Sequence, residues 1–303
     1  MVVNSGGTIE GAISKIKYFG RKSEMDERKL TDELVESYRI YLIREEKSSA
    51  TVEKYLRDVR GFFAFAGGES ITKDLVLDYK RRLQESGYSV RSINSMLASI
   101  GSLLAYTGWQ DCKVKSIRQQ KQTYCPEEKE LTKGEYLRLL TAAKKRRQLW
   151  LVMQTICGTG IRVSEIRHFT VEAVQTGEVV IDCKGKTRRI LIPGKLRKLL
   201  LEYAQNKNIR SGVIFLNRNG KALSRSCIWA QMKGLCEKAG VKPGKVFPHN
   251  LRKLFARTFY SIEKDIAKLA DILGHSSIDT TRIYIMSTGT EHRRKIERLG
   301  LVI

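Results

Sequence analysis

The C-terminal third of the chain contains the stretch LGHSSIDTTRIY, residues 273–284. Gly274 is typical of a residue that ends a helix, which leaves His275 exposed just past that helix. Asp279 suits the N-cap of the next helix, and this helix carries Tyr284. Taken one at a time, such a tyrosine is more often a core residue and such a histidine a surface residue. The stretch is informative only together with the rest of the chain.

A second stretch, HNLRKLFA, covers residues 249–256. Pro248 is a good first residue for a helix. A step of three residues then places His249 and Arg252 on one face of that helix. The pattern H-x-x-R is common by chance, so a solvated helix face is the plainer interpretation of these two residues alone.

A third stretch, GTGIRVSEI, covers residues 158–166. Arg162 follows two glycines, which allow a ligand to approach the backbone closely. Glu165 lies three residues further on and can orient the guanidinium group of Arg162. A purely structural ion pair between the two is the competing interpretation.

A β-hairpin is predicted between the second and third of these stretches. Residues 178–183 and 187–192 are rich in strand-forming residues, and Lys184-Gly-Lys186 separates them. Residues 213–216 form a short apolar run that predicts a third strand. Lysines in such a turn are ordinarily exposed to solvent.

The residue types in these stretches match one kind of chemistry when taken together. Transfer of a phosphoryl group to tyrosine builds negative charge on the non-bridging oxygens, and bidentate guanidinium groups fit that geometry. Preorganised positive charge then takes the role that magnesium has in other enzymes. A tyrosine hydroxyl, with an ordinary pKa of about 10, needs a base or a strong field to attack. The departing 5′-oxygen needs a proton, which a lysine can supply.

The composition of the chain favours a nucleic-acid partner. Its 303 residues carry 56 Lys and Arg against 32 Asp and Glu, a formal net charge of +24. Such an excess repels itself unless a polyanion is the partner. The six cysteines have no C-x-x-C spacing and the histidines number only four, so we expect neither a zinc site nor another cofactor. Without a signal peptide or a membrane-length apolar stretch, we expect a cytoplasmic protein.

Periodicity divides the chain into four segments. Residues 1–28 are weakly periodic and predict a partly ordered tail. Residues 29–110 contain four amphipathic segments, which predict an all-α domain. Thr31, Thr72 and Ser89 are predicted to cap the first, third and fourth of these helices. Residues 111–128 are polar, basic and aperiodic, as is typical of an exposed linker. Residues 129–303 form the second domain, which is predicted to be mostly helical with a small sheet.

The second domain is expected to begin with a capping box made by Thr132 and Glu135. Its later helices are predicted near residues 225–239, 248–262, 265–273 and 279–286.

The order Arg…Lys…H-x-x-R…His…Tyr resembles the tyrosine recombinase (phage integrase-like) family, and most of all its Xer-type members. From His249 to His275 is 26 residues (275 minus 249), and from His275 to Tyr284 is 9 (284 minus 275), and both intervals suit the family. The resemblance extends over nearly the whole chain, since residues 51–63 resemble the core-binding domain of the family. It implies a mainly α, two-domain DNA clamp: an all-α, SAM-like core-binding domain, and an α+β catalytic domain with a small antiparallel sheet.

The resemblance also implies a role for each matching residue. Tyr284 would be the nucleophile that forms a 3′-phosphotyrosyl bond. Arg162 and Arg252 would hold the scissile phosphate. His249 would be an acid, a base or a hydrogen-bond donor to the phosphate, and His275 would donate to the transition state. Lys184 would be the general acid, with Lys186 as a close competitor for that role.

The activity implied is site-specific recombination of double-stranded DNA by a homotetramer, through a Holliday junction. A second recombinase or an accessory factor is a possible partner, and association with the nucleoid is expected. Integration, excision, inversion and dimer resolution all stay open. The alternatives are a type IB topoisomerase-like enzyme and a non-catalytic DNA-binding regulator on the same fold. Tetramer formation on a specific site would distinguish the first alternative, and binding without cleavage would support the second.

Overall fold

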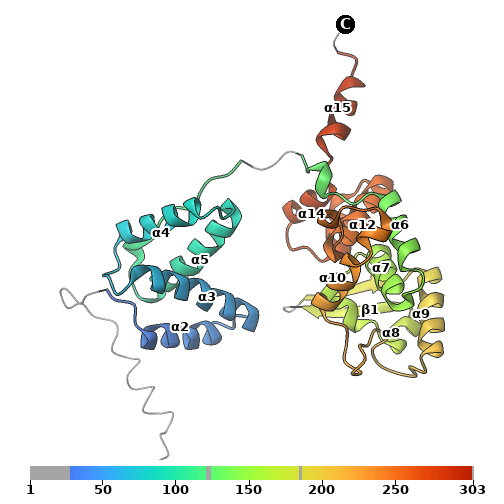
Figure 1. Cartoon of the computed structure of the whole chain (residues 1–303), viewed down its shortest axis with the longest axis horizontal. Helices are drawn as coiled ribbons and strands as arrows, with labels where there is room; N and C mark the ends of the chain where they lie inside the picture. The colour runs from blue at the N-terminus through green and yellow to red at the C-terminus, as the bar shows by residue number, and fades with distance from the viewer. Residues whose placement is uncertain (1–27, 121–123, 184–185, 302–303) are drawn as a thin grey trace, which may run out of the picture. The chain divides into compact units, whose positions relative to one another are not determined.

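The computed structural model describes residues 28–120, 124–183 and 186–301. The expected N-terminal tail, apart from residue 28, lies outside the described residues, and so does Lys184. The chain divides into two compact units between residues 121 and 122, and each is described here by itself (Figure 1). The described residues are mostly helical and form one two-stranded antiparallel sheet, which confirms the predicted fold class.

The described part of the first unit is built from four helices and a short 3-10 turn. These elements are α2 (Asp32–Arg44), α3 (Ser49–Ala66), α4 (Lys73–Glu85), α5 (Val90–Tyr106) and η1 (Gln110–Cys112). The side chains of Thr31, Thr72 and Ser89 each accept a hydrogen bond from a backbone N–H in the first turn of α2, α4 and α5, as predicted. Helix α3 packs against both α2 and α5, and their apolar faces form the core of this unit.

The polar stretch expected to form the linker begins inside the first unit. Cys112 is 1% exposed and belongs to the core of that unit. The backbone N–H of Ile117 donates to the side chain of Asn94 at 2.8 Å. Residues near 112–117 are therefore fastened to the helical bundle.

The second unit contains the sheet and the remaining helices. Its elements are η2 (Glu127–Lys129), α6 (Lys133–Ala143), α7 (Arg147–Thr159), η3 (Val163–His168), α8 (Val171–Thr176), β1 (Glu178–Cys183), β2 (Lys186–Leu191), α9 (Gly194–Asn206), α10 (Arg225–Lys233), α11 (Cys236–Ala239), η4 (Pro243–Lys245), α12 (Pro248–Glu263), α13 (Ile266–Leu273), α14 (Ile278–Ile285) and α15 (Gly289–Glu297). The predicted capping box of Thr132 and Glu135 begins α6. Helix α7 lies at the centre, in contact with α6, α9, α10 and α12 (Figure 1).

The predicted hairpin is present, with Glu178 opposite Leu191 and Ile181 opposite Arg188. The predicted third strand at residues 213–216 is wrong. Its two ends make only isolated bridges, to Thr170 and to Ala222, because the chain passes on from there to α10 without pairing along its length.

One predicted helix, residues 225–239, is broken. Helix α10 ends at Gly234 and a separate turn, α11, follows from Cys236. Glycine favours such an interruption because it loses more backbone freedom in a helix than any other residue. The break turns Leu235 and Cys236 into the core, where they are 2% and 5% exposed.

Candidate active site

Two of the helices that end on a glycine in the left-handed conformation lie at the candidate site. Helix α7 ends at Gly160, with a φ of 66°, and α13 ends at Gly274, with a φ of 63°. A Cβ atom on Gly160 would lie 2.4 Å from Cδ1 of Phe255, and one on Gly274 would lie 2.8 Å from Cδ of Arg188. Both helices thus end with backbone carbonyls that have no partner within the helix, and these carbonyls face the candidate site.

Arg162 follows the end of α7 and is held by Glu165. The backbone N–H of Arg162 donates to Oε2 of Glu165 at 2.7 Å, and Nη1 of Arg162 donates to Oε1 at 3.0 Å. Nη2 of Arg162 donates to the carbonyl oxygen of Gly274 at 3.0 Å. The side chain of Glu165 is only 9% exposed, whereas that of Arg162 is 42% exposed, so the guanidinium group remains open to a ligand.

Arg252 lies on α12 and is almost completely buried, with an exposed fraction of 1%. Nη1 donates to the carbonyl oxygen of Gly160 at 2.5 Å, and Nη2 donates to that of Leu273 at 2.6 Å. Burial, followed by the nearby charge of Arg162, lowers the pKa of Arg252 to about 10. The group therefore stays charged at neutral pH, although its surroundings disfavour the charge.

His275 contacts both Arg252 and Thr281 through its two ring nitrogens. Nε2 lies 2.9 Å from Nη2 of Arg252, and Nδ1 lies 2.8 Å from Oγ1 of Thr281. A guanidinium group has only donors, so Nε2 must be the acceptor, and the proton of the neutral ring is on Nδ1. Burial, and then the charges of the arginines, lower the pKa of His275 to about 4, which agrees with a neutral ring. The ring is half-buried and not exposed as predicted, because α14 packs over it.

The helix that carries Tyr284 begins differently from the prediction. Ser277, and not Asp279, is the N-cap of α14, and its Oγ accepts from the backbone N–H of Asp279 at 3.2 Å. Asp279 lies in the first turn, where its charge still suits the positive end of the helix dipole.

Tyr284 packs between the two histidines. Its ring centroid lies 5.0 Å from that of His249 and 4.8 Å from that of His275. The guanidinium carbon of Arg252 lies 5.8 Å from the centre of the tyrosine ring. Tyr284 is 8% exposed and packs in a small apolar cluster with residues of α12 and α13. Burial, and then the charges of Lys253 and Arg252, lower the pKa of His249.

The structure thus brings together five of the six predicted site residues, and Lys184 lies outside the described residues. It also adds Arg188, which the sequence prediction missed. Nη2 of Arg188 lies 2.5 Å from Oε2 of Glu165, and the side chain is 12% exposed. The alternation of side chains along the strand could have identified it, because Arg188 lies two residues before the buried Ile190 and therefore points to the same side of the sheet.

The cluster combines three positive charges with one negative charge. Arg162, Arg188 and Arg252 supply the guanidinium groups, and Glu165 is the carboxylate that pairs with two of them. An incoming phosphate would be attracted by the uncompensated positive charge. A tyrosine beside such a cluster can act as a nucleophile toward phosphorus, and the adjacent imidazoles can move protons.

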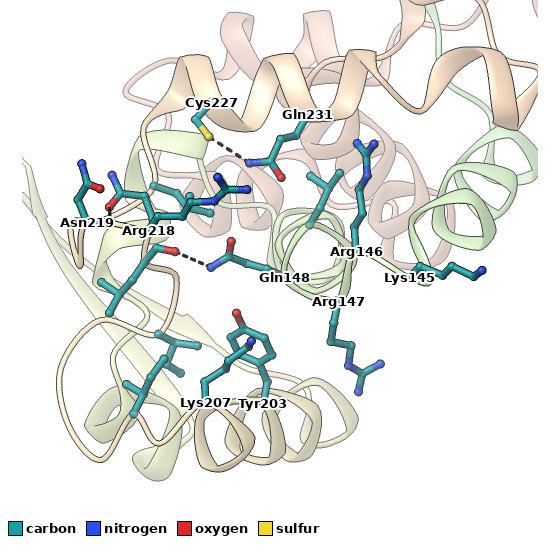
Figure 2. A pocket seen from close by; sticks show the side chains of 16 residues that line it. Lys145, Arg146, Arg147, Gln148, Tyr203, Lys207, Arg218, Asn219, Cys227 and Gln231 are labelled. Atoms are coloured by element: carbon teal, nitrogen blue, oxygen red, sulfur yellow. Dashed lines mark hydrogen bonds between the residues drawn. The ribbon is translucent and has the colours of Figure 1, made fainter.

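A hollow with a volume of about 1030 Å³ lies elsewhere in the second unit (Figure 2). The five basic side chains that line it, without a lining carboxylate, are Lys145, Arg146, Arg147, Lys207 and Arg218. The side-chain amide of Gln148 donates to the carbonyl oxygen of Leu216 at 2.7 Å. Gln231 donates to Sγ of Cys227, as the dashed line in Figure 2 marks. We call this hollow the basic pocket. Its charge suits a polyanion, and none of the five predicted catalytic residues that the structure describes lines it.

Two further kinds of feature do not occur in the described ranges. No group of three or more His, Cys, Asp or Glu side chains that could hold a metal ion is found there. Within the same ranges, every helix is too short or too polar to cross a membrane.

Comparison with known proteins agrees with the geometry of this cluster. The sequence pattern of the phage integrase family matches residues 129–291, and that of the phage integrase N-terminal SAM-like domain matches residues 35–111. The catalytic match alone covers more than half of the chain and includes every predicted site residue.

Similar proteins are found both by sequence and by structure. The tyrosine recombinase XerA of Pyrococcus furiosus is 29% identical over 288 residues, which cover 92% of this chain and 98% of that protein. The tyrosine recombinase XerD of Listeria monocytogenes is 28% identical over 282 residues, which cover 84% of this chain and 93% of that protein. A lambda integrase (75–356) dimer bound to a COC′ core site has a similar fold, with a TM-score of 0.70 and 16% identity over 86% of this chain and 96% of that one. This chain belongs to the phage integrase family and is a tyrosine-type site-specific DNA recombinase.

Proposed function

We propose that Tyr284 is the nucleophile of this recombinase. Its phenolic oxygen attacks a backbone phosphorus of duplex DNA, the bond from phosphorus to the 5′-oxygen breaks, and a 3′-phosphotyrosyl bond forms. The proposal rests above all on one observation, the convergence of Tyr284, His275 and Arg252 at the same end of α12. Rejoining is the same step in reverse, with a 5′-hydroxyl of another strand as the attacking group.

Arg162 and Arg252 hold the scissile phosphate in this proposal. The exposed guanidinium of Arg162 is the first to meet a non-bridging oxygen. Arg252 supplies positive charge that its hydrogen bonds to two backbone carbonyls hold in place. Burial strengthens the interaction of this charge with the transition state. Charge that is already in place does not have to reorganise during the reaction.

The histidines and a hairpin lysine handle the protons. His249 lies beside the tyrosine ring, and its lowered pKa keeps it neutral and able to accept the phenolic proton at neutral pH. His275 donates to the transition state when its ring proton is on Nε2, and in that tautomer the hydroxyl of Thr281 donates to Nδ1. We assign protonation of the 5′-oxygen to Lys184, on the family resemblance alone.

Tyr284 lies in a covered position. With Tyr284 at 8% exposure, its hydroxyl does not reach a phosphate until the ring leaves its packing against His249 and His275. Exposing a packed aromatic side chain costs about 2 kcal/mol. The binding energy of the DNA is sufficient to supply this. Cleavage is therefore coupled to correct placement of the duplex.

The partner in this proposal is double-stranded DNA, bound by a homotetramer that exchanges strands through a Holliday junction. The lambda integrase to which the chain is similar was solved as a dimer bound to a core site. Association with the nucleoid would follow from this partner. Measuring the mass of the complex on a specific site distinguishes a tetramer from a protein that acts alone.

Covalent trapping tests the assignment of the nucleophile. The protein is incubated in EDTA with a nicked suicide substrate made from DNA that flanks the gene, and adducts are separated on a denaturing gel. Wild type should form an adduct, and Tyr284→Phe should not. Tyr260→Phe is the matched control, since Tyr260 packs in the same apolar cluster and should keep the adduct.

Each other outcome has a definite meaning. An adduct that persists in Tyr284→Phe identifies a different nucleophile. Specific binding without any adduct in wild type contradicts the proposed cleavage and supports a binding role instead.

A further inference from the structure

Arg188 is a third guanidinium beside the two that we assign to the phosphate. It projects from β2 and makes contacts on two sides. Nη2 of Arg188 pairs with Oε2 of Glu165 at 2.5 Å. Nη1 donates to the carbonyl oxygen of Leu273 and, at 3.3 Å, to that of Ile272, both at the C-terminus of α13.

Arg188 shares an acceptor with each of the two phosphate-binding arginines. Glu165 accepts from Arg188 through Oε2 and from Arg162 through Oε1. The carbonyl oxygen of Leu273 accepts from Arg188 and also from Arg252. The side chain of Arg188 is 12% exposed, so little of it is available for direct contact with DNA.

The turn after α13 is shaped around this side chain. Gly274 has a φ of 63°, and a Cβ atom there would come within 2.8 Å of Cδ and 3.0 Å of Nη1 of Arg188. The carbonyl of the same glycine accepts from Arg162, and His275 follows directly. A displacement of Arg188 would therefore reach Arg162 and His275 through a single turn of backbone.

We propose that Arg188 is a positioning residue for strand cleavage: it holds the Glu165 carboxylate and the end of α13, and thereby sets the positions of Arg162 and Arg252 for the scissile phosphate. The inference rests on the roles proposed above for those two arginines. Arg188 acts through them and does not touch the DNA.

Charge is the second part of its action. With Arg188 present, one carboxylate is divided between two guanidinium groups, so Arg162 keeps an uncompensated positive charge for the phosphate. Without Arg188, the whole charge of Glu165 compensates Arg162, and the attraction for an anion weakens. Burial is the largest cause of the low pKa of His275, and the charge of Arg188 is one of the further causes.

Two substitutions separate geometry from charge. Arg188→Met removes the charge, and Arg188→Lys keeps it but cannot bridge the carboxylate and the carbonyls with one nitrogen. The rate constant of adduct formation is measured on the suicide substrate at saturating protein, beside the Kd for uncleaved DNA. Both variants should cleave about 10- to 100-fold more slowly, the size of effect that a misplacement near 1 Å produces. Arg188→Lys should keep the wild-type Kd for uncleaved DNA, and in Arg188→Met the Kd should rise by a smaller factor than the cleavage rate falls.

The matched control is Arg189→Met on the same strand. Arg189 is 71% exposed and pairs with Glu178 on the other side of the sheet, so its loss should leave the cleavage rate unchanged. NMR titration of His275 adds a readout that a purely structural role would not produce. Its pKa should rise in Arg188→Met and stay low in Arg188→Lys. If Arg188→Met does not fold, as judged by urea unfolding, Arg188→Lys decides the geometric claim.

A substrate with sulfur in place of the 5′-bridging oxygen tests the most direct alternative. A thiolate leaves without needing a proton, so this substrate restores variants that lack only the general acid. We expect the Arg188 variants to stay slow on it. Full restoration would overturn the inference and assign Arg188 to leaving-group protonation. Cleavage of the ordinary substrate at the wild-type rate by both variants would also overturn it, because Arg188 would then have no role in cleavage. If wild type itself forms no adduct, the proposed function fails first.

Discussion

Thr281 offers a sharp test of how His275 is held. It lies on α14, its side chain is 0% exposed, and its Oγ1 is 2.8 Å from Nδ1 of His275. Because Nε2 accepts from Arg252, Nδ1 carries the proton and donates it to Thr281. The hydroxyl can also reverse its role and donate to Nδ1 when the ring proton is on Nε2 instead. We therefore expect Thr281 to support His275 both before and during cleavage.

The magnitude follows from the burial of the pair. Thr281→Val keeps the shape of the side chain but leaves the Nδ1–H of His275 without a partner, which costs about 1–3 kcal/mol of unfolding free energy. Thr281→Ser keeps the hydroxyl but removes a buried methyl group, which costs about 1 kcal/mol. The unfolding free energy should therefore fall in both variants. Only the valine variant should lose cleavage, by about 10- to 100-fold, because only there is the ring free to turn away from Arg252.

The assay is single-turnover adduct formation on the suicide substrate, with urea unfolding of the same samples. Thr280→Val is the control, because Thr280 is the exposed neighbour on the same helix and should leave both quantities unchanged. The reasoning is refuted if Thr281→Val cleaves at the wild-type rate, or if Thr281→Ser loses as much cleavage as Thr281→Val.

Three further predictions follow from the same structure. The pKa of His275 falls from 6.5 to about 4 on folding, so its contribution to the unfolding free energy is present above pH 6.5 and is lost as the pH falls toward 4. Solvent screening reduces this contribution to about 1–2 kcal/mol. Urea unfolding at pH 5 and pH 7.5, with His275→Gln as the control, checks it. Gly274→Ala forces a Cβ against Arg188, at a left-handed backbone conformation that costs about 1–2 kcal/mol. This substitution should lower both the unfolding free energy and the cleavage rate. Gly244→Ala is the control, because the space around Gly244 is open, and it should lower neither. Non-specific DNA affinity should fall steeply as the salt concentration rises. Replacing Lys207 and Arg218 of the basic pocket by alanine should make the slope of the log of the association constant against log salt shallower by about 1–2. An unchanged slope would contradict a phosphate contact in the basic pocket.

The parts of the fold that the sequence predicted well depend on local chemistry. The caps at Thr31, Thr72 and Ser89, and the capping box of Thr132, involve bonds between residues three apart in the chain. The helix end at Gly274 is equally local, because a left-handed residue at that point excludes most side chains. Such features need no knowledge of what packs against them.

The parts that were wrong or missed depend on contacts between distant segments. The N-cap of α14 moved from Asp279 to Ser277 because both residues can cap, and packing over His275 decides where the helix begins. Arg188 was missed because its partners lie 23 to 85 positions away along the chain, in Glu165 and in the carbonyls of α13. The near-complete burial of Arg252 could not be predicted either, since an arginine at a helix surface is ordinarily exposed.

Three guanidinium groups lie close together in the site, and their contacts show what compensates their charge. A single carboxylate, Glu165, compensates two of them. The rest of the compensation comes from helix ends, because Gly160, Leu273 and Gly274 turn backbone carbonyls toward the arginines. These carbonyls are the negative ends of the dipoles of α7 and α13, and each contact of this kind stabilises a cation by up to about 2 kcal/mol when partly buried. Neutral dipoles hold the charges in place without cancelling them, so the cluster keeps its attraction for a phosphate. A carboxylate at each position would stabilise the free protein more and bind DNA less, which is why glycine-ended helices suit this site.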